Sequence, residues 1–276
     1  MQLFSYHTHT SFSDGKNSVR EMIEKAIELG WKEIGISDHL IIHQNIQNSP
    51  SWYKWQKEPD FFYSDFTVYY EKFARHMDEI RQVSEQYSLK VRIGAEVDYF
   101  IYPGWVEEFV KMRNKLNLDY CISGNHFLFL DDEGRNIIDF KDARNLPEEK
   151  QKNMIKRHFL TLCQAASSNL FDFMAHIDYI RKIPLCSDND FWEEKMNLIK
   201  TIASNDVAVE ISTKGLRKSN QFYPANNLLK NAIDNNIKFV ISDDAHRTSE
   251  LGYEFNYAEN TLQALNCSRR WSFINK

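Results

Sequence analysis

The chain has 276 residues and a net charge of −5, with a pI near 6.0. These values allow one large domain with a substantial core and argue against a nucleic-acid scaffold, which would carry a basic face. No apolar run approaches the roughly 20 residues that cross a bilayer, and the first residues lack the segments of a signal peptide. The four cysteines form no CxxC pair, so no zinc ribbon or disulfide framework is indicated. We expect a cytoplasmic protein that binds neither nucleic acid nor membrane, with its oligomeric state left open.

Short apolar strands alternate with amphipathic helices along the chain. The expected strands are residues 3–7, 33–37, 90–96, 120–123, 171–175, 207–211 and 238–242. The expected helices are residues 18–29, 67–87, 104–116, 148–167, 191–204, 226–235 and 257–265. This alternation is typical of a parallel sheet covered by helices, and the length suits a single α/β barrel. In such barrels the chemistry lies at the carboxyl ends of the strands.

Two stretches interrupt this alternation near the expected mouth of the barrel. Residues 41–66 are long, irregular and aromatic, and they follow directly after His39. Long insertions of this kind are usually functional, so we expect either a lid or binding loop, or an aromatic flap over the barrel edge. Residues 127–146 carry the acidic turn 131–134, which we interpret as part of a solvated hairpin.

The most informative residues are histidines and carboxylates at strand ends. His7 and His9 are two residues apart, as are Asp244 and His246. Alternate residues of an extended strand face the same side, so each pair can converge on one ion. In a closed barrel the first and last strands are neighbours, which would bring the two pairs together.

Further donors end the strands in between. Glu96, His126 and His176 each lie at or just past a strand end, and a carboxylate at Glu96 could bridge two cations. Taken singly, each histidine is more often structural than a ligand; taken together they indicate a metal enzyme. A mixed set of imidazoles and carboxylates favours zinc, manganese or iron over calcium.

These residues stand in a recognisable series of motifs. The series is HTHTSFSDG from residue 7, SDH from 37, GAEVD from 94, SGNH from 123, AHIDY from 175 and SDDAH from 242. Together they resemble the PHP (polymerase and histidinol phosphatase) superfamily across the whole chain. Their order and spacing are most similar to its monofunctional histidinol-phosphate phosphatases. The resemblance implies a distorted (β/α)7 barrel over residues 1–276 that holds three divalent transition metal ions, with manganese, zinc and iron as candidates.

The resemblance also implies which residues hold each ion. The first ion would take His7, His9, Glu96 and Asp244; the second would share Glu96 with His126 and His176; the third would take Asp14, His39 and His246. The family carries either His or Asp at the position of Asp14. The other histidines match no motif: we expect His76 and His158 to be structural or surface residues, whereas His43 lies in the mouth insertion and could contact a substrate.

Such a site suits hydrolysis of a phosphate monoester. Divalent ions lower the pKa of bound water to about 7 and align the phosphoryl group for in-line attack. Asp244, His246 or a water held by an ion could protonate the leaving alkoxide, and the sequence does not separate them. Arg181 and Arg217 follow strand ends, and an arginine fork suits a phosphate. Glu210 would contact substrate or orient an arginine.

The resemblance implies a substrate and leaves alternatives. The implied reaction is hydrolysis of L-histidinol phosphate to L-histidinol and phosphate in histidine biosynthesis. Asp98, Tyr99, Asp178 and the aromatic insertion are available as partners for the ammonium and imidazole of that substrate. The alternatives are a phosphoesterase acting on another small ester and a non-catalytic, metal-stabilised interaction module.

Overall fold

The computed structural model describes residues 2–52 and 62–274 and contains the expected parallel sheet. Its strands follow one another in sequence order: β1 (Phe4–Ser5), β2 (Glu33–Ile36), β5 (Lys90–Val97), β6 (Tyr120–Ser123), β9 (Phe173–Met174), β10 (Ala208–Ser212) and β11 (Phe239–Ser242). Every neighbouring pair on this path is parallel. Parallel neighbours need a crossover between them, which the intervening helices provide.

The first and last strands meet, as the barrel hypothesis requires. Thr8 and Ala245 form a parallel bridge beyond the ends of β1 and β11. The His9 amide donates to the Ala245 carbonyl at 2.9 Å, and the Ala245 amide donates to the His7 carbonyl at 3.3 Å. The sheet therefore forms a nearly closed barrel, and these hydrogen bonds lie between the two pairs of expected metal ligands.

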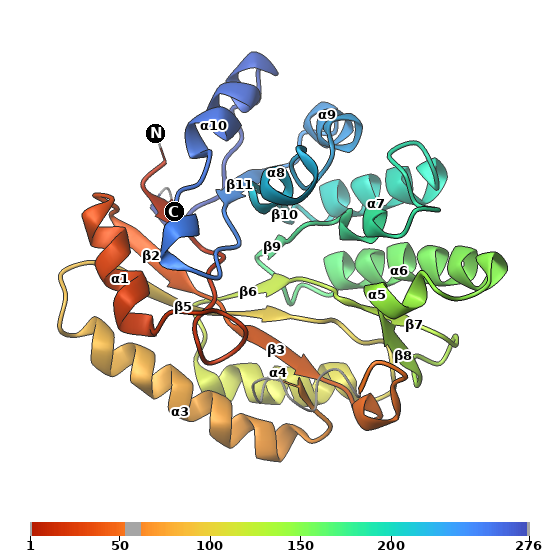
Figure 1. The fold of residues 1–276 in the computed structure, drawn as a ribbon, viewed down its shortest axis with the longest axis horizontal. Helices are drawn as coiled ribbons and strands as arrows, with labels where there is room; N and C mark the ends of the chain where they lie inside the picture. The colour runs from red at the N-terminus through yellow and green to blue at the C-terminus, as the bar shows by residue number, and fades with distance from the viewer. Residues whose placement is uncertain (1, 53–61, 275–276) are drawn as a thin grey trace.

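Helices surround the strands in a ring (Figure 1). They are α1 (Val19–Glu28), α3 (Phe66–Ser84), α4 (Trp105–Leu116), α6 (Glu148–Ser167), α7 (Trp192–Ser204), α9 (Asn226–Asp234) and α10 (Phe255–Ala264). Their bounds lie close to those expected, because cap and apolar periodicity agree; Ser18 caps α1 in a capping box with Glu21. Among the described residues, no helix is long and apolar enough to cross a membrane.

Several short elements were not expected. They are β3 (His39–Ile42), β4 (Phe62–Tyr63), α5 (Phe140–Ala143), α8 (Lys214–Ser219) and the 3-10 turns η1 (Ile46–Asn48), η2 (Tyr179–Lys182) and η3 (Thr248–Glu250), whereas β7 (Phe127–Phe129) and β8 (Ile137–Asp139) lie in the expected hairpin. Elements this short give little periodic signal in a sequence. Two of them, α5 and α8, carry residues that bear on the site described below.

The two insertions take different forms. Residues 127–129 and 137–139 pair as an antiparallel hairpin, which confirms that part of the interpretation. Both strands are largely buried, and the solvent-exposed part is confined to the turn, because the apolar strand residues pack onto the body of the protein. In the other insertion, β3 pairs with β4 and β5. Residues 53–61 lie outside the described residues, so the choice between lid and flap stays a prediction.

His43 is a structural residue in this fold. It is fully buried, its Nε2 lies 2.8 Å from the Gly134 carbonyl oxygen, and its ring packs edge-on against Phe100 and Tyr102. The structure therefore does not support contact between His43 and a substrate, the role that the sequence left open. The tertiary contact with the 127–146 hairpin decides its role, and no local pattern announces that contact.

Aromatic side chains fill the amino end of the barrel. Tyr6, Tyr120 and Phe173 are fully buried there, with Trp271 and Phe273 packed against them. Gly35 and Gly94 make room for this packing, because a Cβ at either position would overlap the Tyr120 side chain. The barrel is therefore closed at this end, and its polar interior residues lie at the other.

Candidate metal centre

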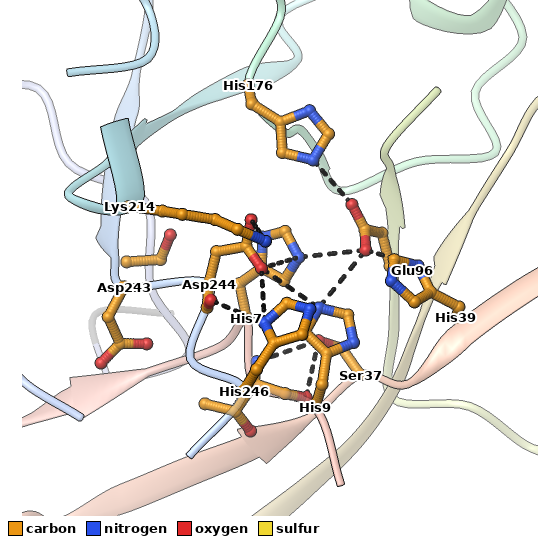
Figure 2. Close-up of polar contacts among 12 residues, drawn as sticks. His7, His9, Ser37, His39, Glu96, His176, Lys214, Asp243, Asp244 and His246 are labelled. Atoms are coloured by element: carbon orange, nitrogen blue, oxygen red, sulfur yellow. Dashed lines mark hydrogen bonds and ion pairs between the residues drawn. The ribbon is translucent and has the colours of Figure 1, made fainter. Parts of the chain in front are cut away.

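All nine expected ligands converge at the carboxyl end of the barrel, and Figure 2 shows those other than Asp14 and His126. Glu96, near the end of β5, lies at the centre. Its oxygens are 2.8 Å from His176 Nε2, 2.9 Å from His39 Nδ1, 3.2 Å from His7 Nε2, 3.4 Å from His9 Nε2 and 3.6 Å from His126 Nε2. A single carboxylate among imidazoles from several strands has the position expected of a bridging ligand.

The remaining ligands complete the cluster on the β1 and β11 side. Asp244 Oδ1 lies 3.3 Å from His9 Nε2 and 3.7 Å from His7 Nε2. Asp14 Oδ1 lies 3.1 Å from His246 Nε2 and 3.4 Å from His39 Nε2. The donor atoms fall into overlapping sets with metal-site spacing: His9, Asp14, His39 and His246; His7, Glu96 and His176; His7, His9 and Asp244; His39, Glu96 and His126. The first set contains the implied third grouping, and the set of His7, His9 and Asp244 holds three of the four ligands of the first. His126 and His176 of the implied second grouping fall in different sets, which share Glu96.

The donor atoms fit divalent transition ions. Several are buried and lack a hydrogen-bond partner among the described residues: His7 Nε2, both ring nitrogens of His9, Asp14 Oδ1, Glu96 Oε2 and Asp244 Oδ1. Leaving such atoms buried and unpaired costs about 1–3 kcal/mol each, more for charged groups. Nitrogen and oxygen donors in this mixture suit zinc, manganese or iron. A bound cation would compensate the cost that the fold otherwise carries.

The charges at the site also favour cations. Burial alone would raise the pKa of Glu96, but His7, His39 and His126 outweigh it and hold that pKa well below its usual range. Burial, together with repulsion from His246 and His39, lowers the pKa of His9 to about 3. The central carboxylate is therefore ionised and His9 is neutral at physiological pH, which are the forms that bind metals. Burial alone would lower the pKa of His7 and His39, but the neighbouring carboxylates outweigh it and raise the pKa of both, so a bound ion would displace protons from these two rings.

Two carboxylates outside the cluster orient its histidines. Glu210 Oε1 lies 2.6 Å from His7 Nδ1, and Asp98 Oδ1 lies 2.9 Å from His126 Nδ1. With Nδ1 engaged in this way, Nε2 of each ring faces the cluster. Glu210 is also fully buried, so of the two roles expected for it, contact with substrate or orientation of an arginine, the structure supports neither; it orients His7.

Asp38 holds the loop that carries Asp14. Its carboxylate accepts hydrogen bonds from the Thr10 amide and hydroxyl, both at 2.7 Å, and lies 2.8 Å from His76 Nε2. His76 stacks on Phe12 of the same loop. His76 is therefore structural, as expected. The aspartate of the SDH motif, Asp38, has a structural role as well, because it holds this loop in place.

Two of the ligands have an unusual backbone. His176 has φ 28° and Asp244 has φ 47°, both in the left-handed region that residues with a Cβ seldom adopt. Such residues cost about 1–3 kcal/mol each and cluster at functional sites. Each follows the end of a barrel strand, so the strained turn directs its side chain inward rather than along the strand.

The two arginines expected to bind phosphate are engaged with protein groups. Arg217 Nη2 donates to the main-chain oxygens of Asp243 at 2.9 Å and Asp244 at 3.4 Å. Arg181 donates to Asp178 at 3.2 Å and to Ser219 at 2.9 Å. Arg217 thus supports the end of β11, and Arg181 links Asp178 to the end of α8. A direct contact of either arginine with phosphate stays a prediction.

A lysine that sequence reasoning missed lies against the cluster. Lys214 Nζ is 2.9 Å from Asp244 Oδ2, and Figure 2 shows its side chain reaching toward the ligands. Burial alone would lower its pKa, but the carboxylate of Asp244 outweighs that effect and raises it. The sequence did contain a signal for Lys214: it lies just past β10, shortly after Glu210, and most other expected site residues also lie near the ends of strands.

A cavity of about 430 Å³ opens beside the ligands. It is lined by Asp14, His39, Ile41, His126, Phe127, Asp139, Phe140, Lys141, Arg144, Tyr179 and Lys182. The residues suggested earlier as substrate partners lie elsewhere: Asp98 holds His126, Asp178 accepts from Arg181 and the Ala225 amide, and Tyr99 packs on Trp105. The residues that do line it come mainly from the hairpin, α5 and η2.

Several known proteins are similar to this chain in sequence or fold. The PHP domain model matches residues 5–214. A Deinococcus radiodurans protein named probable histidinol-phosphatase is 27% identical over 255 residues, 90% of this chain and 88% of that protein. A Listeria monocytogenes structure described as a candidate histidinol phosphatase has a TM-score of 0.70 at 21% identity, covering 92% of this chain and 99% of that one. A Lactococcus lactis histidinol phosphate phosphatase, solved with zinc, L-histidinol and phosphate, has a TM-score of 0.65 at 17% identity, covering 97% and 95%.

Proposed function

The chain belongs to the PHP domain family, and from this premise we propose that it is a metal-dependent phosphatase that hydrolyses L-histidinol phosphate to L-histidinol and phosphate. The observation that carries the proposal is the set of buried, unpartnered donor atoms around Glu96. The Deinococcus relative and the Lactococcus complex support the choice of substrate, since their names specify it.

The proposed ion sites are those that the family resemblance implies, and the convergence of the donor atoms around Glu96 supports them. His7, His9, Glu96 and Asp244 would hold one ion, Glu96 with His126 and His176 a second, and Asp14 with His39 and His246 a third. Manganese, zinc or iron bound there would supply Lewis acidity and a water of lowered pKa. Both the number of ions, three, and the identity of the metal are part of the proposal.

The chain's own residues would then position the substrate. Asp98 and Glu210 fix the rings of His126 and His7, and the cavity beside the cluster offers aromatic faces at Phe140 and Tyr179. We propose Asp244 and His246 as the acid candidates for the leaving oxygen. We also propose that Arg217, which donates to the main-chain oxygens of Asp243 and Asp244, binds the phosphate together with Arg181.

The domain organisation, cellular location and partners of the protein are also part of the proposal. We take residues 1–276 as one PHP-type domain whose insertions 41–66 and 127–146 shape its mouth. A cytoplasmic location agrees with the four cysteines, which are free and buried, since secreted proteins of this kind more often pair them. Neither nucleic acid nor membrane is expected as a partner.

The test is steady-state phosphate release by the purified, manganese-supplemented protein. The panel is L-histidinol phosphate, sugar phosphates, nucleotides and esters with a second anionic group; the last are included because Lys141, Arg144 and Lys182 line the cavity. We expect kcat/KM above about 10⁴ M⁻¹s⁻¹ for L-histidinol phosphate, with the other esters far behind.

The other outcomes separate the alternatives. Preference for another ester would keep the metal chemistry and refute the substrate. No turnover of any ester by a folded protein that holds its metals would favour the non-catalytic interaction module.

A further inference from the structure

Lys214 is placed at the cluster by the end of β10. The strand ends at Ser212, the Thr213 amide donates to the Ser242 carbonyl at 2.9 Å, and α8 begins at Lys214. This hydrogen bond ties the turn to the end of β11, where Asp244 lies. The lysine side chain therefore leaves the turn toward the ligands rather than toward the helix surface.

The carboxylate of Asp244 is divided between the lysine and the cluster. Oδ2 is 2.9 Å from Lys214 Nζ, whereas Oδ1 is 3.3 Å from His9 and 3.4 Å from His246. One oxygen thus remains directed at the histidines while the other is held by the ammonium. The lysine does not compete for the oxygen that an ion would use.

The ammonium of Lys214 has N–H donors left for a ligand. It has three donors, and within residues 2–52 and 62–274 its ion-pair partner is Asp244. Its side chain is 18% exposed, so it is reachable from the mouth. Its charge acts on Tyr179 and Lys182, both of which line the cavity beside the cluster.

We propose that Lys214 is a specificity-determining residue that binds the dianionic phosphoryl group of the substrate. The proposal rests on the proposed phosphatase function. A monoester dianion carries one more negative charge than a diester, and a fixed ammonium beside the cluster favours the group with the larger charge. Lys214 thereby selects monoesters.

The test compares the manganese-loaded wild type with Lys214→Met, which keeps the unbranched stem, and with Lys214→Arg. Lys218→Met is the matched control, since Lys218 lies one turn further along α8 and is exposed. Inorganic phosphate is titrated by calorimetry, and metal content per chain is measured on the same samples. Turnover of p-nitrophenyl phosphate and of bis(p-nitrophenyl) phosphate gives the preference for monoesters.

We expect Lys214→Met to weaken phosphate binding about 10- to 100-fold, as for loss of a charge-assisted hydrogen bond. Its preference for the monoester falls by a similar factor while its metal content is unchanged. Lys214→Arg recovers most of the binding, and Lys218→Met behaves as wild type.

Three results would overturn the role of Lys214. The first is unchanged phosphate binding in Lys214→Met, and the second is absence of phosphate binding in the wild type. The third is loss of metal in Lys214→Met with unchanged phosphate affinity of the sites that remain loaded, which would make the lysine a charge partner of Asp244 alone. Failure of the proposed function has a different signature, namely a wild type that binds phosphate through Lys214 and turns over no ester.

Discussion

The two ends of the barrel interior are built on opposite principles. At the amino end, Tyr6 and Tyr120 pack with Phe173, and their polar atoms are paired: the Tyr120 hydroxyl donates to the Tyr6 carbonyl at 2.7 Å, and the Tyr6 hydroxyl contacts Glu33. At the carboxyl end, buried donor atoms around Glu96 lack partners among the described residues.

The comparison shows that side-chain packing at the amino end stabilises the fold, whereas the carboxyl end is arranged to bind a ligand. Close packing of apolar rings stabilises the barrel without any ligand. Unpaired buried carboxylates and imidazoles destabilise it until a cation binds. Variants at the two ends should therefore separate stability from metal binding, and the predictions below test that separation.

The largest effect is expected at the centre of the cluster. Glu96→Gln removes the charge that five histidines share, so we expect loss of metal and a decrease in kcat/KM on the order of 10³-fold or more. The protein should stay folded, because the aromatic end is untouched. Phosphate release, metal analysis and circular dichroism check this. Glu133→Gln, in the exposed hairpin turn, is the control; an active Glu96→Gln would refute the assignment.

The second effect is expected at the opposite end. Phe173 is fully buried, so Phe173→Ala should lower the free energy of unfolding by about 3–5 kcal/mol. Metal content and kcat of the folded fraction should be retained. Leu160→Ala, at a residue 54% exposed, should change stability by less than about 0.5 kcal/mol. Urea unfolding measures both. Loss of metal in a folded Phe173→Ala protein would break the separation of the two ends.

A smaller effect is expected from the residues that orient the ligands. In Asp98→Asn the amide would donate toward His126 Nδ1 and disfavour the tautomer whose Nε2 lone pair faces the cluster. We expect metal affinity or activity to fall about 10- to 100-fold, with little change in unfolding in the presence of chelator. A metal titration measures the affinity, and Asp98→Glu serves as the charge-preserving comparison. Unchanged affinity in Asp98→Asn would show that Asp98 does not set the tautomer.

The smallest effect concerns a buried histidine outside the cluster. Burial lowers the pKa of His43 to about 4, below the usual value near 6.5, so the unfolded chain binds more protons between these values. The stability that depends on neutral His43 is complete above pH 6.5 and is lost as the pH falls toward 4. Between pH 7 and pH 5 we expect a loss of about 1–2 kcal/mol.

Urea unfolding of wild type and His43→Gln at both pH values, with chelator present, isolates this contribution. The difference between the two proteins should shrink as the pH falls, because only the wild type carries the titrating ring. A constant difference would show that His43 does not titrate on unfolding.

Much of the fold followed from local pattern. The strand 90–96 and helix 148–167 were recognisable because apolar periodicity, caps and length agreed, and the chain order of the strands became their order in the sheet. The short elements around Phe140 and Lys214 were missed, since a few residues held by tertiary contacts carry no periodic signal.

The sequence by itself supplied the candidate ligands: most are histidines or carboxylates near strand ends, which lie on one side of a parallel barrel, and the resemblance to the PHP superfamily added Asp14. Only the tertiary structure decided what surrounds them. Glu210 orients His7, Asp38 supports the loop of Asp14, and Lys214 reaches Asp244. These contacts join segments far apart in the chain, and a residue's partner across a barrel is set by closure and packing rather than by its neighbours in sequence.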